Sequence, residues 1–112
     1  MEKDERFVYV SGKYTDDSLL GEIDNIAYAE GVGKILASYD INVYVPHMAT
    51  CLWDDINNYR YFMNLHKSFL DSWATDIYMM SNYEDSNGAL EELELAQKNG
   101  LNVWYEIGRA HV

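Results

Sequence analysis

Apolar residues follow two different spacings along this chain. Short runs rich in β-branched and aromatic residues occur at 7–11, 41–45, 76–80 and 102–106. The segments between them, at 18–38, 59–73 and 87–98, carry apolar residues three and four positions apart. The short runs are typical of buried strands, and the longer segments are typical of amphipathic helices. Because strands alternate with helices, the sequence predicts βαβ units with right-handed crossovers around a parallel sheet, in a single domain over residues 1–112.

The first two helices have apolar faces that are expected to pack on the sheet. In the first helix, for which Ser18 is a suitable N-cap, this face consists of Ile23, Ile26, Ala29, Val32 and Leu36. In the second helix it consists of Phe62, Leu65, Phe69 and Trp73. Gly31 and Gly33 weaken the first helix by up to about 1 kcal/mol each relative to alanine, unless they permit close packing on the sheet.

The last helix places its glutamates on different faces. At about 3.6 residues per turn, Glu92 falls beside Ala89 and Ala96, which belong to the apolar stripe of the helix. Glu91 and Glu94 fall on the other, solvated side. Glu92 is therefore an acidic residue near a helix start that points toward packing.

Three connections follow the carboxyl ends of strands, at 12–17, 46–57 and 81–88. In an open parallel sheet these ends lie at one edge, which is the usual place for a ligand. The segment 46–57 is long enough to be a candidate lid. Ser86 and Gly88 lie at a helix start, where free N–H groups favour a phosphate or carboxylate. An ordinary helix cap explains these two residues equally well.

Composition and charge restrict the partners. The 112 residues are 48% hydrophobic and 14% aromatic, which predicts an ordered globule. The formal net charge is −11, and the 8 Lys and Arg residues are too few to favour binding to a nucleic-acid polymer. A single nucleotide remains compatible, because local N–H groups can hold one anion. Cys51 has no partner for a disulfide and no apolar run reaches the ~18 residues of a membrane span, so a cytoplasmic location and no membrane partner are expected.

Glu92 has a specific chemical use in this position. A low-pKa carboxylate in the first turns of a helix stays ionised, and it can attack or stabilise an oxocarbenium-like anomeric carbon. The alternative is a helix-boundary glutamate that a tyrosine satisfies.

The remaining polar candidates are weaker. Asp54 and Asp55 have no His or Cys at ligand spacing, so they fit solvated loop acids, and neither a metal nor a cofactor is expected. His47 and His66 have no nucleophile motif nearby, which gives no support for a catalytic triad, and His66 borders an apolar stripe as packed histidines do. Trp53 could stack on a base, or lie in the core or a subunit contact.

Several short segments together resemble a known family. They are Tyr-Val-Ser-Gly-Lys-Tyr at 9–14, Asn25 with Ala29, Val-Pro-His at 45–47, Asp76, and Ser-Asn-Gly-Ala-Leu-Glu-Glu at 86–92 followed by Ala96, Gly100 and Val103. Over residues 7–105 the chain resembles the nucleoside 2-deoxyribosyltransferase-like superfamily, most of all its small phage and bacterial members. The segment 86–92 is also similar to the S-x-G-x-x-x-E segment of the deoxynucleoside 5′-monophosphate N-glycosidases.

This resemblance implies a fold and a set of site residues. The fold would be a flavodoxin-like three-layer α/β/α sandwich, with a parallel sheet of four or five strands in the order 2-1-3-4. Glu92 would be the nucleophile that attacks C1′ of the sugar. The turn containing Ser86 and Gly88 would hold a 5′-phosphate. The other substrate-binding residues would be Gly12, Lys13, Tyr14 and His47, with Lys13 adding positive charge toward a phosphate.

The implied activity is that of an N-glycosidic bond hydrolase or deoxyribosyltransferase acting on nucleosides or nucleoside 5′-monophosphates. The resemblance also implies a homo-oligomer, for which the aromatic-rich second helix offers a surface. One position departs from the family pattern: Ser68 stands eight residues before Asp76, where active relatives usually carry an acid. Asp71 or His66, on the same helix, could substitute for that acid.

Two other functions remain open at this point. A nucleotide-binding module that sequesters its ligand without turnover is compatible with the Ser68 departure. An oligomeric structural protein is the third possibility, and in that case its own side chains would fill the pocket.

Overall fold

Strands and helices alternate along the chain as the sequence predicts. The computed structural model describes residues 5–106. Its strands are β1 (Phe7–Ser11), β2 (Asn42–Tyr44), β3 (Asp76–Met79) and β4 (Asn102–Tyr105). Its helices are α1 (Leu19–Ser38), α2 (Pro46–Ala49), α3 (Tyr59–Ser72) and α4 (Asn87–Lys98), with a 3₁₀ turn η1 (Tyr83–Asp85). The predicted elements are confirmed to within one residue at either end, whereas α2 and η1 lie in segments that were expected to be irregular.

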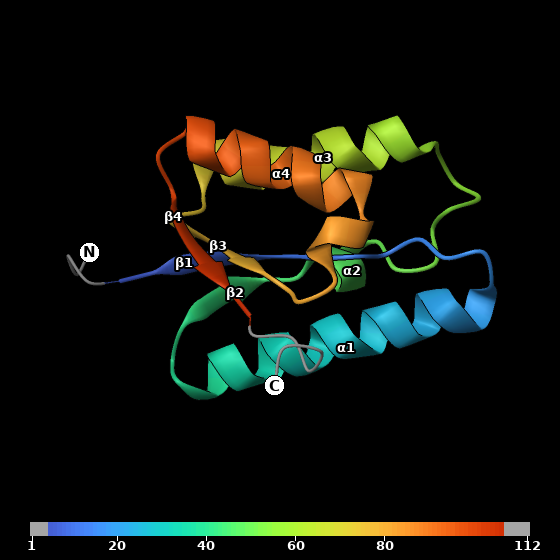
Figure 1. The fold of residues 1–112 in the computed structure, drawn as a ribbon, viewed down its shortest axis with the longest axis horizontal. Coiled ribbons are helices and arrows are strands. Elements are labelled where there is room, and N and C mark those ends of the chain that lie inside the picture. The colour runs from blue at the N-terminus through green and yellow to red at the C-terminus, as the bar shows by residue number, and fades with distance from the viewer. Residues whose placement is uncertain (1–4, 107–112) are drawn as a thin grey trace.

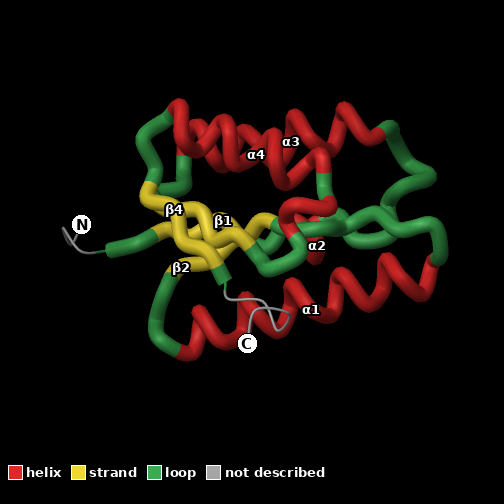
Figure 2. Tube along the Cα trace, in the orientation of Figure 1, coloured by secondary structure: helices red, strands yellow, loops and turns green. Residues whose placement is uncertain are grey.

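The four strands form one parallel sheet in the order β2-β1-β3-β4. Helix α1 covers one face of the sheet, and α3 and α4 lie side by side on the other (Figures 1 and 2). This arrangement is a flavodoxin-like three-layer α/β/α sandwich, which confirms the expected fold and strand order. It puts β1 at the centre, paired with β2 on one side and β3 on the other.

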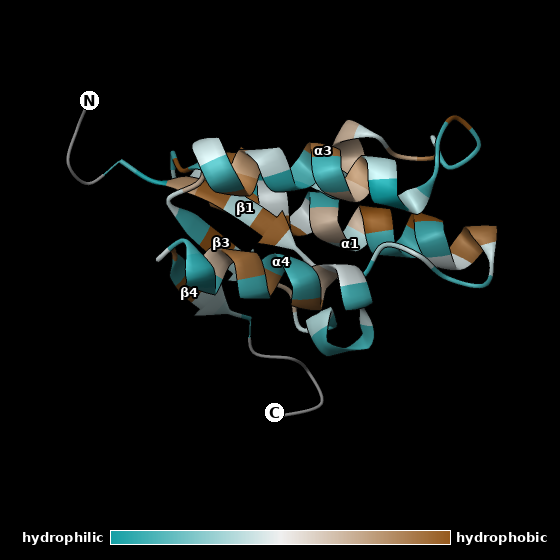
Figure 3. Ribbon diagram, turned by 90° about the horizontal axis from the view of Figure 1, so that it is seen from above, coloured by the Kyte–Doolittle hydropathy of each residue, from teal (hydrophilic) through white to brown (hydrophobic). Residues whose placement is uncertain are grey.

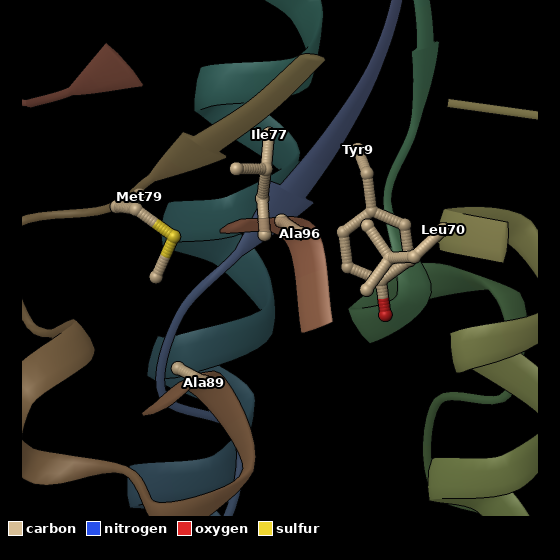
Figure 4. Packing of buried hydrophobic residues seen from close by; sticks show 6 residues of the cluster. All are labelled: Tyr9, Leu70, Ile77, Met79, Ala89 and Ala96. Carbon is tan, nitrogen blue, oxygen red and sulfur yellow. The ribbon is translucent and has the colours of Figure 1, made fainter. Parts of the chain in front are cut away.

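The core is divided by the sheet into two clusters. Alternate residues of the central strands face opposite sides, so Tyr9 and Ile77 pack toward α4 while Val10 packs toward α1. Figure 4 shows the first cluster, in which Tyr9, Ile77 and Met79 meet the small side chains of α4 and Leu70 of α3. In Figure 3, hydrophilic and hydrophobic residues alternate along α3 and α4, and apolar residues of both helices pack on this cluster.

Helix α1 buries less of its predicted face than expected. Ala29, Val32 and Gly33 are buried, but Ile23 is 41% exposed, so its prediction as a packed residue is wrong. The reason is visible in Figure 1, where the N-terminal half of α1 extends beyond the strands. None of the helices within residues 5–106 is long and apolar enough to cross a membrane.

The buried face of α3 is rotated by about one residue from the predicted one. Met63, His66 and Leu70 are buried, whereas Leu65 is 37% exposed and the predicted aromatic residues of this face are half-buried. The apolar spacing misplaced the face because it excluded the polar side chain of His66. That side chain is accommodated by two hydrogen-bond partners, which are described below.

Pro46 begins a helix instead of only ending a strand. Val45 is the N-cap of α2 and Pro46 occupies its first turn, where the fixed φ of proline suits a helix and its missing N–H costs nothing. The predicted candidate lid therefore starts with a helical turn that lies directly after β2. This turn places His47 at the carboxyl edge of the sheet.

Asp76 lies away from that edge and has a structural role. Its carboxylate is fully buried and accepts hydrogen bonds from Arg6 Nη1 at 2.9 Å, Trp104 Nε1 at 2.7 Å and the Thr75 hydroxyl. These partners join the start of β3 to β4 and to the residue before β1. A buried carboxylate is tolerated only with such partners.

The two glycines of α1 are predicted to respond oppositely to substitution by alanine. A Cβ on Gly33 would lie 2.7 Å from Cγ2 of Val45, whereas a Cβ on Gly31 would meet nothing within 4 Å. We expect Gly33→Ala to lower the free energy of unfolding by about 1–3 kcal/mol through overpacking. Gly31→Ala is expected to raise it by up to about 1 kcal/mol, because alanine has the higher helix propensity. Urea unfolding of both variants measures this, and equal effects would contradict the packing of α1 on Val45.

Candidate active site

A cavity of about 600 Å³ lies at the carboxyl edge of the sheet. This volume is within the range of small-molecule sites, about 300–1,000 Å³. Its lining comes from the three predicted connections together with α2, α3 and α4, and includes Gly12, Tyr14, His47, Thr50, Asp54, Tyr59, Met63, His66, Asp85, Ser86, Gly88 and Glu92. The three connections thus converge on one site, as their positions after parallel strands predict.

Glu92 lies against this cavity with its carboxyl group turned toward β1. It is 6% exposed, and the Tyr9 hydroxyl donates a hydrogen bond to its Oε2. The Ser11 hydroxyl donates to its Oε1 at 2.6 Å. Tyr9 and Ser11 are two residues apart on β1, so both side chains leave the strand on the face that α4 covers. A buried strand therefore supplies one donor to each oxygen of a buried carboxyl group.

The pKa of Glu92 is raised, whereas the sequence predicted a low pKa. Burial raises it from 4.5 to about 7, and the hydrogen bonds from Ser11 and Tyr9 offset only part of that effect. The prediction of a low pKa was wrong because Glu92 is the sixth residue of α4, and the influence of a helix terminus is confined to its first turn. The Tyr9 hydroxyl remains protonated as a donor, since burial and the nearby Glu92 raise its own pKa well above 10.0.

His47 is buried at the side of the cavity. It is 3% exposed, and its Nε2 lies 3.1 Å from the carbonyl oxygen of Lys13. Burial lowers the pKa of His47 to about 4, so the ring is neutral at physiological pH. Its Nδ1 has no hydrogen-bond partner in the part of the chain that the structure describes.

His66 is one of the α3 residues that line the cavity. Its Nδ1 lies 2.9 Å from the Tyr44 hydroxyl and its Nε2 lies 3.1 Å from Oγ1 of Thr50. Burial and the neighbouring His47 lower the pKa of His66 to about 4. Both ring nitrogens of a neutral histidine are therefore in use, one as donor and one as acceptor.

Neither Ser68, at the position of the family's acid, nor Asp71, a possible substitute for it, lines the cavity. Ser68 is exposed, and its hydroxyl donates to the carbonyl oxygen of Leu65 on the same helix. Asp71 is also exposed and accepts a hydrogen bond from Asn99 Nδ2 at 2.9 Å. Of the two residues considered as substitutes for the missing acid, only His66 lines the cavity.

Tyr14 attaches the candidate lid to the first connection. Its hydroxyl donates to Oδ1 of Asp54 at 2.9 Å and accepts from the backbone N–H of Leu52 at 2.9 Å. Leu52 has a φ of 62°, an unusual conformation for a leucine, which the N–H contact helps to hold. Asp54 and Asp55 are exposed, as expected of solvated loop acids, although Asp54 also lines the cavity. Trp53 is 49% exposed and does not line the cavity.

The start of α4 is a capped helix end. The Ser86 hydroxyl accepts the Ala89 N–H at 3.1 Å, which is ordinary N-capping. A Cβ on Gly88 would lie 2.7 Å from the Tyr59 hydroxyl and 3.3 Å from Sδ of Met63. Glycine at this position leaves room for the ends of the Tyr59 and Met63 side chains of α3 against the start of α4.

The structure brings six of the seven predicted site residues together around the cavity. The exception is Lys13, whose side chain does not line it. Its backbone N–H donates to Oδ1 of Asn82 and its carbonyl contacts His47, so Lys13 shapes the connection through its backbone. Within residues 5–106, no group of three or more His, Cys, Asp or Glu side chains is arranged to hold a metal ion.

The sequence suggested a tyrosine as a possible partner of Glu92 but did not single out Tyr9, and it gave no role to Ser11, although both belong to the segment that carries the family resemblance. Their two-residue spacing at the carboxyl end of a strand was the available signal. Thr50 and Tyr44 were also missed. Their contact with His66 depends on the relative position of β2, the lid and α3, which no local pattern encodes.

Fold and site together define a class of protein: a flavodoxin-like α/β protein with a ligand-sized cavity next to a buried, hydrogen-bonded carboxyl group. A family model described as a domain of unknown function (DUF4406) matches residues 6–105, and the chain belongs to this family. A search of curated proteins found no match to the chain.

Replacing Glu92 by glutamine is predicted to stabilise the fold at alkaline pH. The pKa of Glu92 is higher in the folded protein than in the unfolded chain, so its favourable contribution is complete below about pH 4.5 and is lost as the pH rises through about 7. Glu92→Gln should unfold like the wild type near pH 4 and should be up to about 3 kcal/mol more stable at about pH 8.5. Denaturant unfolding at a series of pH values measures the difference.

Glu91→Gln is the matched control on the adjacent residue. Hydrogen bonds from Arg60 and Lys67 lower the pKa of Glu91, so its contribution has the opposite sign and is present at neutral pH. We expect this variant to be less stable than the wild type at neutral pH and to approach it in acid. A Glu92→Gln variant that is less stable than the wild type throughout the pH range would contradict the proposed burial of this carboxyl group.

Proposed function

We propose that this protein cleaves the N-glycosidic bond of a nucleoside or nucleoside 5′-monophosphate, with Glu92 as the nucleophile. The observation that carries the proposal is the Glu92 carboxyl group, which lies against a cavity of about 600 Å³ with one hydroxyl donor on each oxygen. A carboxylate in this setting is suited to attack an electron-poor anomeric carbon. The family resemblance of the segment containing Glu92 supports the same role.

The proposed chemistry proceeds in two steps. One oxygen of ionised Glu92 attacks C1′, the C1′–N bond breaks, and its electron pair leaves with the base, which takes up a proton. Water, or a second base, then displaces the carboxylate from C1′ and releases its own proton. Tyr9 and Ser11 orient the carboxylate for both steps, because each oxygen keeps a lone pair besides the one that accepts their hydrogen bond.

The second candidate is a binding module that keeps the cavity without the chemistry. The observation in its favour is that Ser68 stands where active relatives usually have an acid, and that the nearby α3 residue that does line the cavity is the neutral His66. His66 has both ring nitrogens engaged, by Tyr44 and Thr50, so it cannot act on a sugar as a carboxylate does. In the enzymatic proposal, His66 is a positioning residue that joins β2 to the lid. The open cavity disfavours the third possibility, a structural protein with a filled pocket.

Homo-oligomer formation belongs to the same proposal, as does the cytoplasmic location expected from the sequence. Several large apolar side chains are exposed, among them Leu20 (74%) and Ile35 (62%) on α1 and Ile56 (71%) in the lid. Helix α3 also exposes Tyr61 and Leu65, in keeping with the surface suggested by its aromatic residues. A contact between subunits would remove these side chains from water.

Base release should depend on Glu92 and on its ionisation. With a panel of deoxynucleosides and their monophosphates, Glu92→Gln is expected to lose at least about a thousandfold in kcat/KM, because the nucleophile is removed. Ser68→Ala is the matched control, and its kcat/KM should stay within about twofold of the wild-type value, since Ser68 is exposed and its hydroxyl is hydrogen-bonded within its own helix.

Wild-type kcat/KM should rise with pH through about 7 as Glu92 ionises. Base release that persists in Glu92→Gln would contradict the role of Glu92 as nucleophile. Binding of a nucleoside without base release by the wild type would favour the binding module.

The oligomeric state can be measured by light scattering over a range of protein concentrations. We expect a mass of at least two chains. Substitution of Leu20 or Ile56 by aspartate should reduce that mass if the exposed residues form the contact, because a charge would be buried there. A wild-type protein that has the mass of one chain at high concentration contradicts the proposal.

A further inference from the structure

The start of α4, where the family resemblance would place a 5′-phosphate, is partly covered by other side chains. The Ala89 N–H is already bonded to the Ser86 hydroxyl at 3.1 Å. Gly88 lies against α3, because a Cβ added to it would be only 2.7 Å from the Tyr59 hydroxyl. Tyr59, Ser86 and Gly88 all line the cavity. A phosphate bound by the N–H groups of this helix start would therefore meet the Tyr59 hydroxyl beside Gly88.

The charged side chains that line the cavity are acidic. They belong to Asp54, Asp85 and Glu92, whereas no lysine or arginine of residues 5–106 lines it and the two lining histidines are neutral. Asp85 directly precedes Ser86, the N-cap of α4, so its carboxyl group belongs to the same end of the cavity. A phosphate monoester carries roughly two negative charges at neutral pH, and these carboxylates would repel it.

The basic residues of α3 are paired outside the cavity. Arg60 follows Tyr59 directly, and its Nη1 lies 2.6 Å from Oε1 of Glu91. Nζ of Lys67 lies 2.8 Å from the same oxygen. Neither of these basic residues lines the cavity. A phosphate at the start of α4 would therefore lack a cationic partner among the lining side chains that the structure describes.

An unphosphorylated 5′-hydroxyl suits the same end of the cavity. A hydroxyl group can donate to the Asp85 carboxylate and accept from the Tyr59 hydroxyl, whereas the oxygens of an ionised phosphate only accept. The Tyr59 hydroxyl stays protonated at neutral pH, because burial and the nearby Glu91 and Glu92 raise its pKa.

We propose that Tyr59 and Asp85 make this cavity selective for a nucleoside over its 5′-monophosphate. The inference rests on the proposed function and narrows it, since it chooses between the two kinds of substrate. Tyr59 acts by occupying space beside Gly88, and Asp85 acts by its negative charge. Selectivity of this kind comes from what the site holds against the unwanted ligand as well as from contacts with the preferred one.

Calorimetry with 2′-deoxyadenosine and deoxyadenosine 5′-monophosphate measures this selectivity as the ratio of two affinities. The wild type should bind the nucleoside at least about tenfold more tightly than the monophosphate, because the phosphate is repelled and has no cationic partner. A monophosphate that binds the wild type as tightly as the nucleoside, or more tightly, overturns the proposal.

Two conservative variants test the residues, and a third is the matched control. Tyr59→Phe removes the hydroxyl beside Gly88 and keeps the ring, while Asp85→Asn removes the charge and keeps the size. Each should reduce the preference for the nucleoside roughly threefold or more, because each removes one obstacle to the phosphate. Glu84→Gln makes a similar change of charge on the preceding residue, which is exposed and does not line the cavity, and it should leave the ratio within about twofold.

An unchanged ratio in both Tyr59→Phe and Asp85→Asn overturns the proposal. An equal change in Glu84→Gln and Asp85→Asn also overturns it, because the effect would then come from the overall charge of the protein. Thermal unfolding of each variant confirms that it is folded.

The inference and the proposed function fail in different ways. A wild type that releases the base but prefers the monophosphate rejects the inference and leaves the enzymatic function standing. A wild type that prefers to bind the nucleoside and does not release the base supports the inference and rejects the enzymatic function in favour of the binding module. A wild type that binds neither ligand rejects both.

Discussion

The site depends on one interaction: the buried carboxyl group of Glu92 accepts hydrogen bonds from two hydroxyls of the central strand β1. Glu92 can reach β1 because Ala89 and Ala96 let α4 approach the sheet closely. Tyr9 and Ser11 can both meet it because alternate residues of a strand share a face. The fold thus delivers a polar group from a helix to donors on a strand, at the edge where parallel sheets bind ligands.

Burial and hydrogen bonding act on Glu92 in opposite directions, and burial is the stronger. The resulting pKa of about 7 means that the ionised form of Glu92 is less favourable than that of an exposed glutamate. Such a group reduces the stability of the fold at neutral pH, and a purely structural position would favour glutamine or an apolar residue instead. Retention of glutamate there is understandable if the carboxylate reacts, since functional sites commonly sacrifice stability.

The fold was predictable because each element has its own local signal. Strand β1 reads as a short apolar run, and α4 is bounded by Ser86 at its cap and by Gly100, which has a φ of 73° just beyond its end. The position of Glu92 was predictable from helical periodicity, but its pKa was not, because desolvation depends on everything packed around it. The role of His66 was also beyond the sequence, since a histidine on an apolar face is explained only by partners from β2 and the lid. Ser68, at the position of the family's usual acid, is exposed on α3 and does not line the cavity, which the family spacing alone could not reveal.

Trapping of the covalent intermediate tests the central claim most directly. Incubation with a 2′-deoxy-2′-fluoro nucleoside should slow the release of the sugar after attack, because fluorine destabilises the oxocarbenium-like transition state. Mass spectrometry of the intact protein should then show the added mass of one fluorinated sugar, and digestion should place it on Glu92. Glu92→Gln should show no adduct. An adduct on another residue would contradict the role of Glu92 as nucleophile. The same conclusion would follow if the protein released the base of the natural nucleoside but formed no adduct at Glu92 with the fluorinated analogue.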